Sequence, residues 1–474
     1  MSDIKNSLLV KNLEKFSSKE QLQLKDFANS PIFNKSQALI DLLHYLLKTL
    51  KKAAQPTKEE AFRCLFGTAV FNDHKVRLLM SDLLKLVEDF IVYQQSKKTA
   101  LSREILLSTY YRKADMEKHF DRTHRKAKRQ LPLFPYRNQE YFSLQNKLQW
   151  EQYEVLSSKK RDIAMNLQEL GQSFDIFYFS ARLRQACFLK AQQTFSDISY
   201  DFSWIDQLLL YIEQKEWLSI PAISLYYYAY QLYVDIEAPA NFEALKQQIL
   251  EYSPLFPPEE IRDIYVLTLN YCIRKVNAGQ RAYLKESLDL YKAGLASGCF
   301  LENGVLSKFT FSNIVAMGLM VKDFEWVATF IQDYKNSLKK QDRQSAFCLN
   351  MARLEYTSKR NYDEALTYLQ KVSDKDLLNT LNAKILQLRI YFEIAAYDLL
   401  ESHLEAMSNF IRRKSVMGYH KENFLHLIRY TKKLLKLNLF DKKAITQLAT
   451  AIQAEEVLTE KTWLLEQIKK LKEG

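Results

Sequence analysis

The densest group of charged side chains in the sequence is a short basic cluster. Its members are Arg122, Arg125, Lys126, Lys128 and Arg129. Guanidinium and ammonium groups bind phosphates, so this cluster is a candidate anion or nucleic-acid contact. It also stands directly before Leu131-Pro132, where proline would end a helix whose macrodipole favours cations in its last turn. A solvated helix terminus and a protein docking site therefore remain alternatives.

A second group of residues that suits binding lies in the tyrosine-rich segment 223–236. Apolar residues occupy nearly every face of a helix over this segment, and only Ser224, Gln231 and Asp235 form a narrow polar stripe. Tyrosine offers contact area at low entropy cost and is common at interfaces. Packing in the core and lining of a partner groove are both open, and the candidate groove residues are Tyr226, Tyr228 and Tyr233.

Motifs for nucleotide or metal chemistry are missing from the sequence. A phosphate-binding loop ends in Gly-Lys-Ser/Thr, a triplet that occurs nowhere in the chain. Zinc sites use closely spaced Cys and His donors, whereas His119 with His124 and His420 with His426 have no cysteine pair beside them. The sequence nominates no catalytic, cofactor or metal residue, so we expect a non-enzymatic protein without a cofactor or a small-molecule substrate. An enzyme whose site assembles from distant residues stays an alternative.

Cysteine usage and hydropathy bear on the compartment. Five cysteines at wide spacing are typical of a reducing environment with buried thiols. The first 18 residues include Asp3, Lys5 and Lys11, so they lack the apolar core of a secretory signal. The longest weakly polar stretch, 220–234, is shorter than the roughly 20 residues that cross a bilayer. We expect a cytoplasmic protein with no membrane span.

Composition and periodicity indicate helices as the elements that position these residues. The 474 residues include only 9 Gly and 9 Pro, which leaves little material for hairpin turns and short strands. Apolar residues recur at three- and four-residue steps almost everywhere, as in Leu79, Leu83 and Leu86, and predict about twenty amphipathic helices. Residue types that cap helix N-termini mark several starts, namely Ser18, Thr57, Asn72 and Asp441.

Charge is distributed unevenly along the chain, although the net charge is +12. Lys and Arg exceed Asp and Glu by 26 to 15 in 1–137 and by 14 to 7 in 408–474, whereas acids exceed bases by 34 to 28 in 138–407. Complementary charge speeds association. We therefore expect the acidic middle segment to line part of a groove that accepts a basic or amphipathic helical segment.

A repeat of 35 residues is visible towards the C-terminal end. It overlays Tyr356 on Tyr391, Tyr362 on Tyr397, Asp363 on Asp398 and Leu369 on Leu404. The segment 352–372 resembles the tetratricopeptide repeat, which implies stacked helix pairs over about residues 300 to 440. Arg353 departs from the pattern because it stands where the repeat uses a small residue. No peptide-clamp residues are carried over.

The longer chain resembles a family of uncharacterised bacterial all-helical proteins. The segments that carry this resemblance are Ser30-Pro31-Ile32-Phe33-Asn34-Lys35, residues 77–84 and Trp463-Leu464-Leu465. The resemblance supports the extent and the architecture and implies no activity.

These observations predict an all-α protein, a right-handed α-solenoid of stacked antiparallel helix pairs with an N-terminal helical module. The expected domains are 1–100, a basic connection over 101–137, and the solenoid over 138–474. Stacked pairs create a concave surface, so we expect an intracellular protein–protein interaction scaffold or adaptor whose partner is another protein. The alternative is a nucleic-acid-associated regulator that uses the basic N-terminal region.

Overall fold

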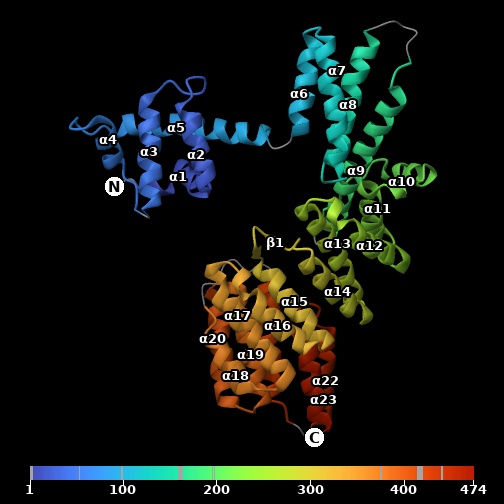
Figure 1. Cartoon of the computed structure of the whole chain (residues 1–474). Coiled ribbons are helices and arrows are strands. Elements are labelled where there is room, and N and C mark those ends of the chain that lie inside the picture. The colour runs from blue at the N-terminus through green and yellow to red at the C-terminus, as the bar shows by residue number, and fades with distance from the viewer. Residues whose placement is uncertain are drawn as a thin grey trace. The chain divides into compact units, whose positions relative to one another are not determined.

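The computed structural model describes residues 4–52, 54–97, 100–158, 164–194, 196, 198–373, 376–413, 420–438 and 441–473. Helices account for 80% of these described residues, which confirms the all-α class. The chain forms two compact units, Met1–Arg182 and Leu183–Gly474. Figure 1 labels the helices along the chain.

The first unit contains eight helices and most of a ninth within its described residues. They are α1 (Leu8–Lys15), α2 (Ser18–Asn29), α3 (Gln37–Lys51), α4 (Lys58–Phe66), α5 (Asp73–Ser96), α6 (Ala100–Lys113), α7 (Glu117–Gln130) and α8 (Gln139–Ser157), followed by the start of α9 (Leu167–Gln193). Helices α1, α2, α3 and α5 share one apolar core. A separate core joins α6, α7 and α8, from Leu101 to Leu148. The expected boundary near residue 137 falls within the span of this second core, and the expected domain limits stay a prediction.

The second unit continues from α9 with helices and one small hairpin. Its helices are α10 (Ile205–Gln214), α11 (Pro221–Val234), α12 (Pro239–Tyr252), α13 (Pro258–Asn277), α14 (Ala282–Ala296), α15 (Lys308–Val321), α16 (Phe324–Tyr334), α17 (Lys340–Leu354), α18 (Tyr362–Leu369), α19 (Leu377–Glu393), α20 (Tyr397–Arg413), α21 (His420–Leu435), α22 (Lys442–Ala454) and α23 (Lys461–Glu473). A π-helical turn, Glu355–Lys359, follows α17.

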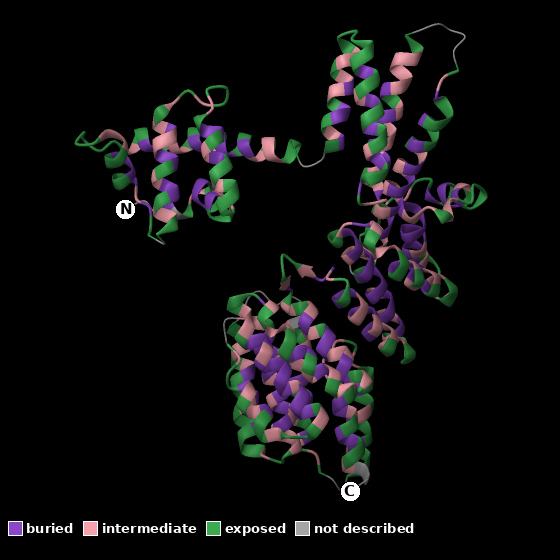
Figure 2. Cartoon of the chain, viewed as in Figure 1, coloured by how far each residue is buried: buried purple, intermediate pink, exposed green. Residues whose placement is uncertain are grey.

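Neighbouring helices of the second unit pack in pairs, as expected for a helical repeat protein. Helices α15, α17 and α19 are each in contact with the helix that follows them. In addition α15 packs on α17, and α17 packs on α19, so the first helices of successive pairs form a row. Figure 2 shows buried residues gathered where these helices face their neighbours. This row is the scaffold on which the candidate site is built.

Helix starts follow local hydrogen bonding. The side chains of Thr57, Asn72 and Asp441 each accept a backbone N–H, which confirms these three N-caps. The expected cap Ser18 is wrong by one residue. Ser17 caps α2, because it stands three residues before Glu20 and the two form a reciprocal capping box.

One hairpin interrupts the helices. Strand β1 (Leu301–Glu302) pairs antiparallel with β2 (Val305–Leu306), with Leu301 opposite Leu306. The two residues between them, Asn303 and Gly304, have φ values of 52° and 77°. Asn-Gly is the dipeptide that a type I′ hairpin turn prefers, so a local signal explains this element.

Candidate functional site

The basic cluster predicted from the sequence lies on α7, and all five of its side chains are exposed. Two of them are bound to neighbouring helices. Lys126 Nζ lies 2.7 Å from Oε1 of the buried Glu104 on α6, and Lys128 Nζ donates to Gln152 on α8. These two lysines therefore help to hold α7 against α6 and α8.

The three arginines of the cluster lie on one stripe of α7. At 100° per residue, Arg122, Arg125 and Arg129 fall within a 60° sector of the helix surface. Among the described residues, no carboxylate lies within 4 Å of these guanidinium groups, and Arg125 Nε donates to the backbone oxygen of Asp121 at 3.1 Å. The stripe is available to an anion, and its role as an anion or nucleic-acid contact stays a prediction.

Two of the three candidate groove tyrosines are core residues. Tyr226 is 1% exposed and donates its hydroxyl to Glu260 Oε1 at 2.7 Å. Tyr233 is 8% exposed and donates to the backbone oxygen of Leu267 at 3.0 Å. Tyr228 is only partly buried and packs edge-on against Tyr227. Of the three, Tyr228 alone presents a side chain that a partner can reach in this structure.

A hollow in the C-terminal part of the second unit joins residues that the sequence did not nominate. It has a volume of about 280 Å³ and is lined by α15, α17, the π-helical turn after α17, α19 and Glu460, which precedes α23. We call it the α15–α19 hollow. Its apolar wall is formed by Leu319 and Met320 of α15 and by Ile385 and Leu386 of α19. Met320 is 54% exposed, whereas Leu319, Ile385 and Leu386 are buried, so Met320 is the part of this wall that is open to solvent.

Packing behind the hollow depends on a small residue. Gly318 on α15 faces α16, and a Cβ atom at this position would lie 2.3 Å from Cγ2 of Val327. Only glycine permits this approach without a shift of one helix. The close contact leaves the opposite side of α15, including Leu319 and Met320, in the wall of the hollow.

Beside the hollow, Glu393 at the end of α19 is the acceptor of a buried hydrogen-bond network. Its side chain is 6% exposed. Oε1 accepts from the Tyr356 hydroxyl at 2.6 Å and from Trp463 Nε1 at 2.9 Å. Oε2 accepts from the Tyr362 hydroxyl at 2.9 Å and from Arg360 at 3.3 Å. Burial alone would raise the pKa of Glu393, but these hydrogen bonds outweigh it and lower the pKa, so the side chain is ionised and fully occupied.

The backbone that presents Tyr356 is unusual. Tyr356 lies in the π-helical turn Glu355–Lys359, and the turn ends at Arg360 in the left-handed conformation, with φ of 52°. π-Helical turns are rare in proteins, and those that occur are often found at functional sites. Here the turn directs the Tyr356 hydroxyl to Glu393 while the side chain also lines the hollow.

Two arginines of the hollow have donors to spare. Arg389 on α19 donates to Glu460 Oε2 at 2.9 Å and to the Tyr356 hydroxyl at 3.0 Å, and its buried Nε has no partner among the described residues. Arg353 on α17 donates to Asn350 Oδ1 at 3.4 Å, and within the described chain no carboxylate lies within 4 Å of it. Burial lowers the pKa of Arg353 because it disfavours the charged form.

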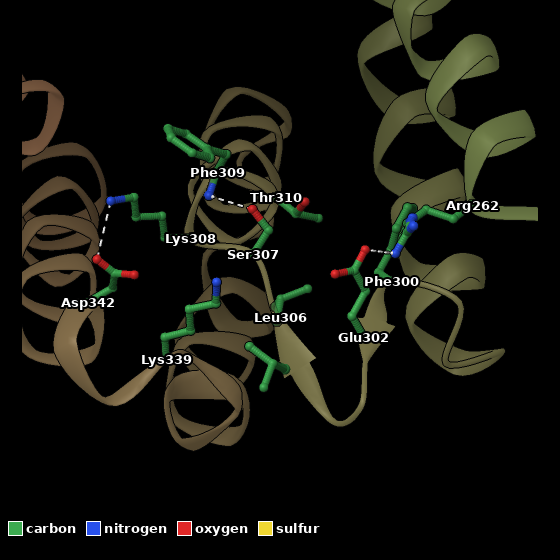
Figure 3. Close-up of a pocket in the computed structure, with 11 residues that line it drawn as sticks. Arg262, Phe300, Glu302, Leu306, Ser307, Lys308, Phe309, Thr310, Lys339 and Asp342 are labelled. Atoms are coloured by element: carbon green, nitrogen blue, oxygen red, sulfur yellow. Dashed lines mark hydrogen bonds and ion pairs between the residues drawn. The ribbon is translucent and has the colours of Figure 1, made fainter. Parts of the chain in front are cut away.

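A second hollow, of about 410 Å³, lies beside the β1–β2 hairpin (Figure 3). Arg262 pairs with Glu302 across it, and Lys308 Nζ lies 3.2 Å from Asp342 Oδ1. Lys339 is exposed at its rim. Because Arg262 and Lys308 already have carboxylate partners, this hollow is a weaker candidate for binding an anionic group than the α15–α19 hollow.

The described residues also bear on metal binding and on membrane insertion. In that part of the chain, no group of three or more His, Cys, Asp or Glu side chains is arranged to hold a metal ion. Nor does any helix there combine the length and the apolar character that crossing a membrane requires. All five cysteines are described and unpaired, and four of them are buried.

Comparisons with known proteins give no match. No protein-family model matches the chain, and no curated protein matches it. The sequence contained one signal for the site: Arg353 departs from the repeat pattern, and it lines the hollow. Arg389 and Glu460 carry no such mark.

Proposed function

We propose that the chain is a non-enzymatic cytoplasmic scaffold whose α15–α19 hollow receives a segment of a partner protein. One observation carries the proposal. Helices α15 and α19 present an apolar wall beside Arg353 and Arg389, and the buried Nε of Arg389 has no partner in the described chain. An open surface of this kind suits a peptide segment rather than an enclosed substrate. The finer architecture, a right-handed tetratricopeptide-like solenoid, is part of the same proposal.

The reactive groups nearby support a binding role over catalysis. Glu393 is ionised and accepts four hydrogen bonds, so it has no free position for proton transfer to a substrate. Burial raises the pKa of Cys272 to about 12, which keeps it a thiol and a poor nucleophile. Unpaired buried thiols also suit a reducing compartment.

The test is affinity capture from native cytosol with a matched pair of variants. Met320→Lys places a charge in the wall of the hollow. Leu399→Lys makes the same kind of change on α20, outside the hollow. The two parent side chains are similarly exposed, at 54% and 59%. We expect wild type and Leu399→Lys to retain the same proteins and Met320→Lys to lose one or more of them. Equal retention by all three would contradict the proposal.

A second candidate function follows from α7. We propose, as the alternative, that the Arg122, Arg125 and Arg129 stripe contacts nucleic-acid phosphates. The variant to test is the triple alanine replacement of these arginines. Lys126 is left intact, because it pairs with the buried Glu104 and helps to hold α7 against α6. Binding to duplex DNA is measured over a range of salt concentrations.

Each lost phosphate contact lowers the log–log salt slope by about 0.9, so the triple variant should lose up to about 2.7. A control variant removes three exposed lysines elsewhere, namely Lys19, Lys442 and Lys443. If control and test variants change the slope equally, the stripe has no specific role.

A further inference from the structure

We propose that the α15–α19 hollow recognises an acidic side chain, Asp or Glu, that lies next to an apolar residue in an extended segment of the partner, with Arg353 and Arg389 as its carboxylate contacts. The inference rests on the proposed scaffold function and names the chemistry of its partner.

The two arginines of the hollow have unused donors. A guanidinium group carries five N–H donors and stays charged in proteins. Arg353 uses one donor on Asn350, at 3.4 Å. Arg389 leaves its buried Nε without a partner in the described chain. A buried donor without a partner is costly, and a carboxylate that binds the Nε of Arg389 removes this cost while it also contacts the unused donors of Arg353.

The carboxylates near the hollow do not bind these unused donors. Glu393 is saturated by Tyr356, Tyr362, Trp463 and Arg360. Glu460 is the remaining carboxylate of the hollow, and it pairs with Arg389 at 2.9 Å. The residues that line the hollow thus include two guanidinium groups and one carboxylate, which gives the hollow a net positive charge. This sign is opposite to the acidic groove that the charge map of the whole segment led us to expect.

The apolar wall lies beside the arginines. Leu319, Ile385 and Leu386 are buried in it and Met320 is 54% exposed, so an occupant that binds the arginines also places an apolar side chain against Met320. A volume of about 280 Å³ is at the lower end of small ligand sites and holds part of a segment rather than a folded body. The lining extends over three helices, which suits a chain that crosses the hollow. We therefore commit to a side-chain carboxylate rather than a chain terminus.

Three peptide pools test the inference on the full-length protein. All are acetylated ten-residue peptides with randomised flanks. The first pool has a central Leu-Glu and an amidated end, the second has Leu-Gln and an amidated end, and the third has Leu-Gln and a free carboxylate. Retention on immobilised protein is quantified by mass spectrometry. We expect the first pool to be retained at least about tenfold better than the second, as the loss of a charge-assisted contact implies. Preference for the third pool would overturn the side-chain assignment.

Two variants then connect retention to the named residues. Arg353→Gln removes a guanidinium that has few internal contacts and should reduce retention of the Leu-Glu pool about tenfold or more. Glu460→Gln removes the internal competitor and should increase it. The control is Arg429→Gln, which breaks a surface ion pair on α21 and should change nothing. Circular dichroism checks that each variant is folded. Unfolding would reduce retention for both variants, so it does not produce a decrease with Arg353→Gln together with an increase with Glu460→Gln.

The outcomes separate this inference from the proposed function. If Met320→Lys loses a captured protein while the Leu-Glu and Leu-Gln pools bind equally, the scaffold stands and the acidic partner does not. If Met320→Lys retains every captured protein and no pool binds, both fail. Weaker retention with Glu460→Gln would also overturn the role assigned to the arginine pair.

Discussion

Replacing Glu393 by alanine should loosen the packing between α19 and α23. The carboxylate accepts two hydroxyl donors and one indole donor, at 2.6 to 2.9 Å, from the π-helical turn, α18 and α23. The fourth donor, Arg360, is 64% exposed and contributes little. Its removal leaves two hydroxyl donors and one indole donor without an acceptor, and because each buried unsatisfied donor costs about 1–3 kcal/mol we expect a total cost of about 3–5 kcal/mol. Since about 1.4 kcal/mol is a tenfold change, local opening should become about 140-fold to 4,000-fold more frequent.

Hydrogen exchange with mass spectrometry at neutral pH measures this opening in peptides from α19 and α23. Glu393→Gln keeps an acceptor for Tyr356 and Trp463 but loses the charge, so its effect should be intermediate. Glu405→Ala, an exposed position on α20, is the control and should leave exchange unchanged. If Glu393→Ala changes exchange in both peptides by less than about threefold, the carboxylate does not hold these helices together and the reasoning is wrong.

The same network predicts a pH dependence. Hydrogen bonds to Glu393 lower its pKa below the ordinary value of 4.5 in the folded state. The unfolded chain therefore binds more protons over this range, and stability falls as the pH drops through 4.5 towards the folded pKa. Thermal melts should show a stability gap between wild type and Glu393→Gln that is full at pH 7 and shrinks as the pH falls below 4.5. A gap that stays constant down to pH 3 would contradict this assignment.

Three further predictions concern packing, thiols and domain limits. Gly318→Ala should lower the melting temperature and cost about 1–3 kcal/mol of folding stability, because the new Cβ would lie 2.3 Å from a methyl carbon of α16. Gly171→Ala is the control: its Cβ would meet nothing within 4 Å, so it should stabilise α9 by up to about 1 kcal/mol. A thiol reagent should modify Cys64 in the native protein and the four buried cysteines only after unfolding; rapid modification of a second thiol would contradict the burial. A fragment 100–474 should melt higher by circular dichroism than 138–474, because α6 and α7 cover an apolar face of α8; equal melts would support the boundary at 137.

Some signals in the sequence were local. The Asn303-Gly304 hairpin turn and the Ser17 capping box both follow from dipeptide and four-residue patterns, although the low glycine content of the whole chain argued against hairpins. Tyr226 and Tyr233 could not be assigned from their own segment. A helix that is apolar on nearly all sides is compatible with a core and with a groove, and only contacts with α13 residues such as Glu260 and Leu267 decide between them.

The sequence by itself determined the all-helical class and the approximate positions of the helices, because periodicity and capping depend on residues within a few turns of one another. It also marked Arg353 as an exception to the repeat. Only the tertiary structure decided that Arg353, Arg389 and Glu460 line one hollow while Glu393 is saturated beside it. Arg353, Arg389 and Glu460 come from α17, α19 and the turn before α23, which are far apart in the chain. The number of donors left to a buried side chain depends on which neighbours packing supplies.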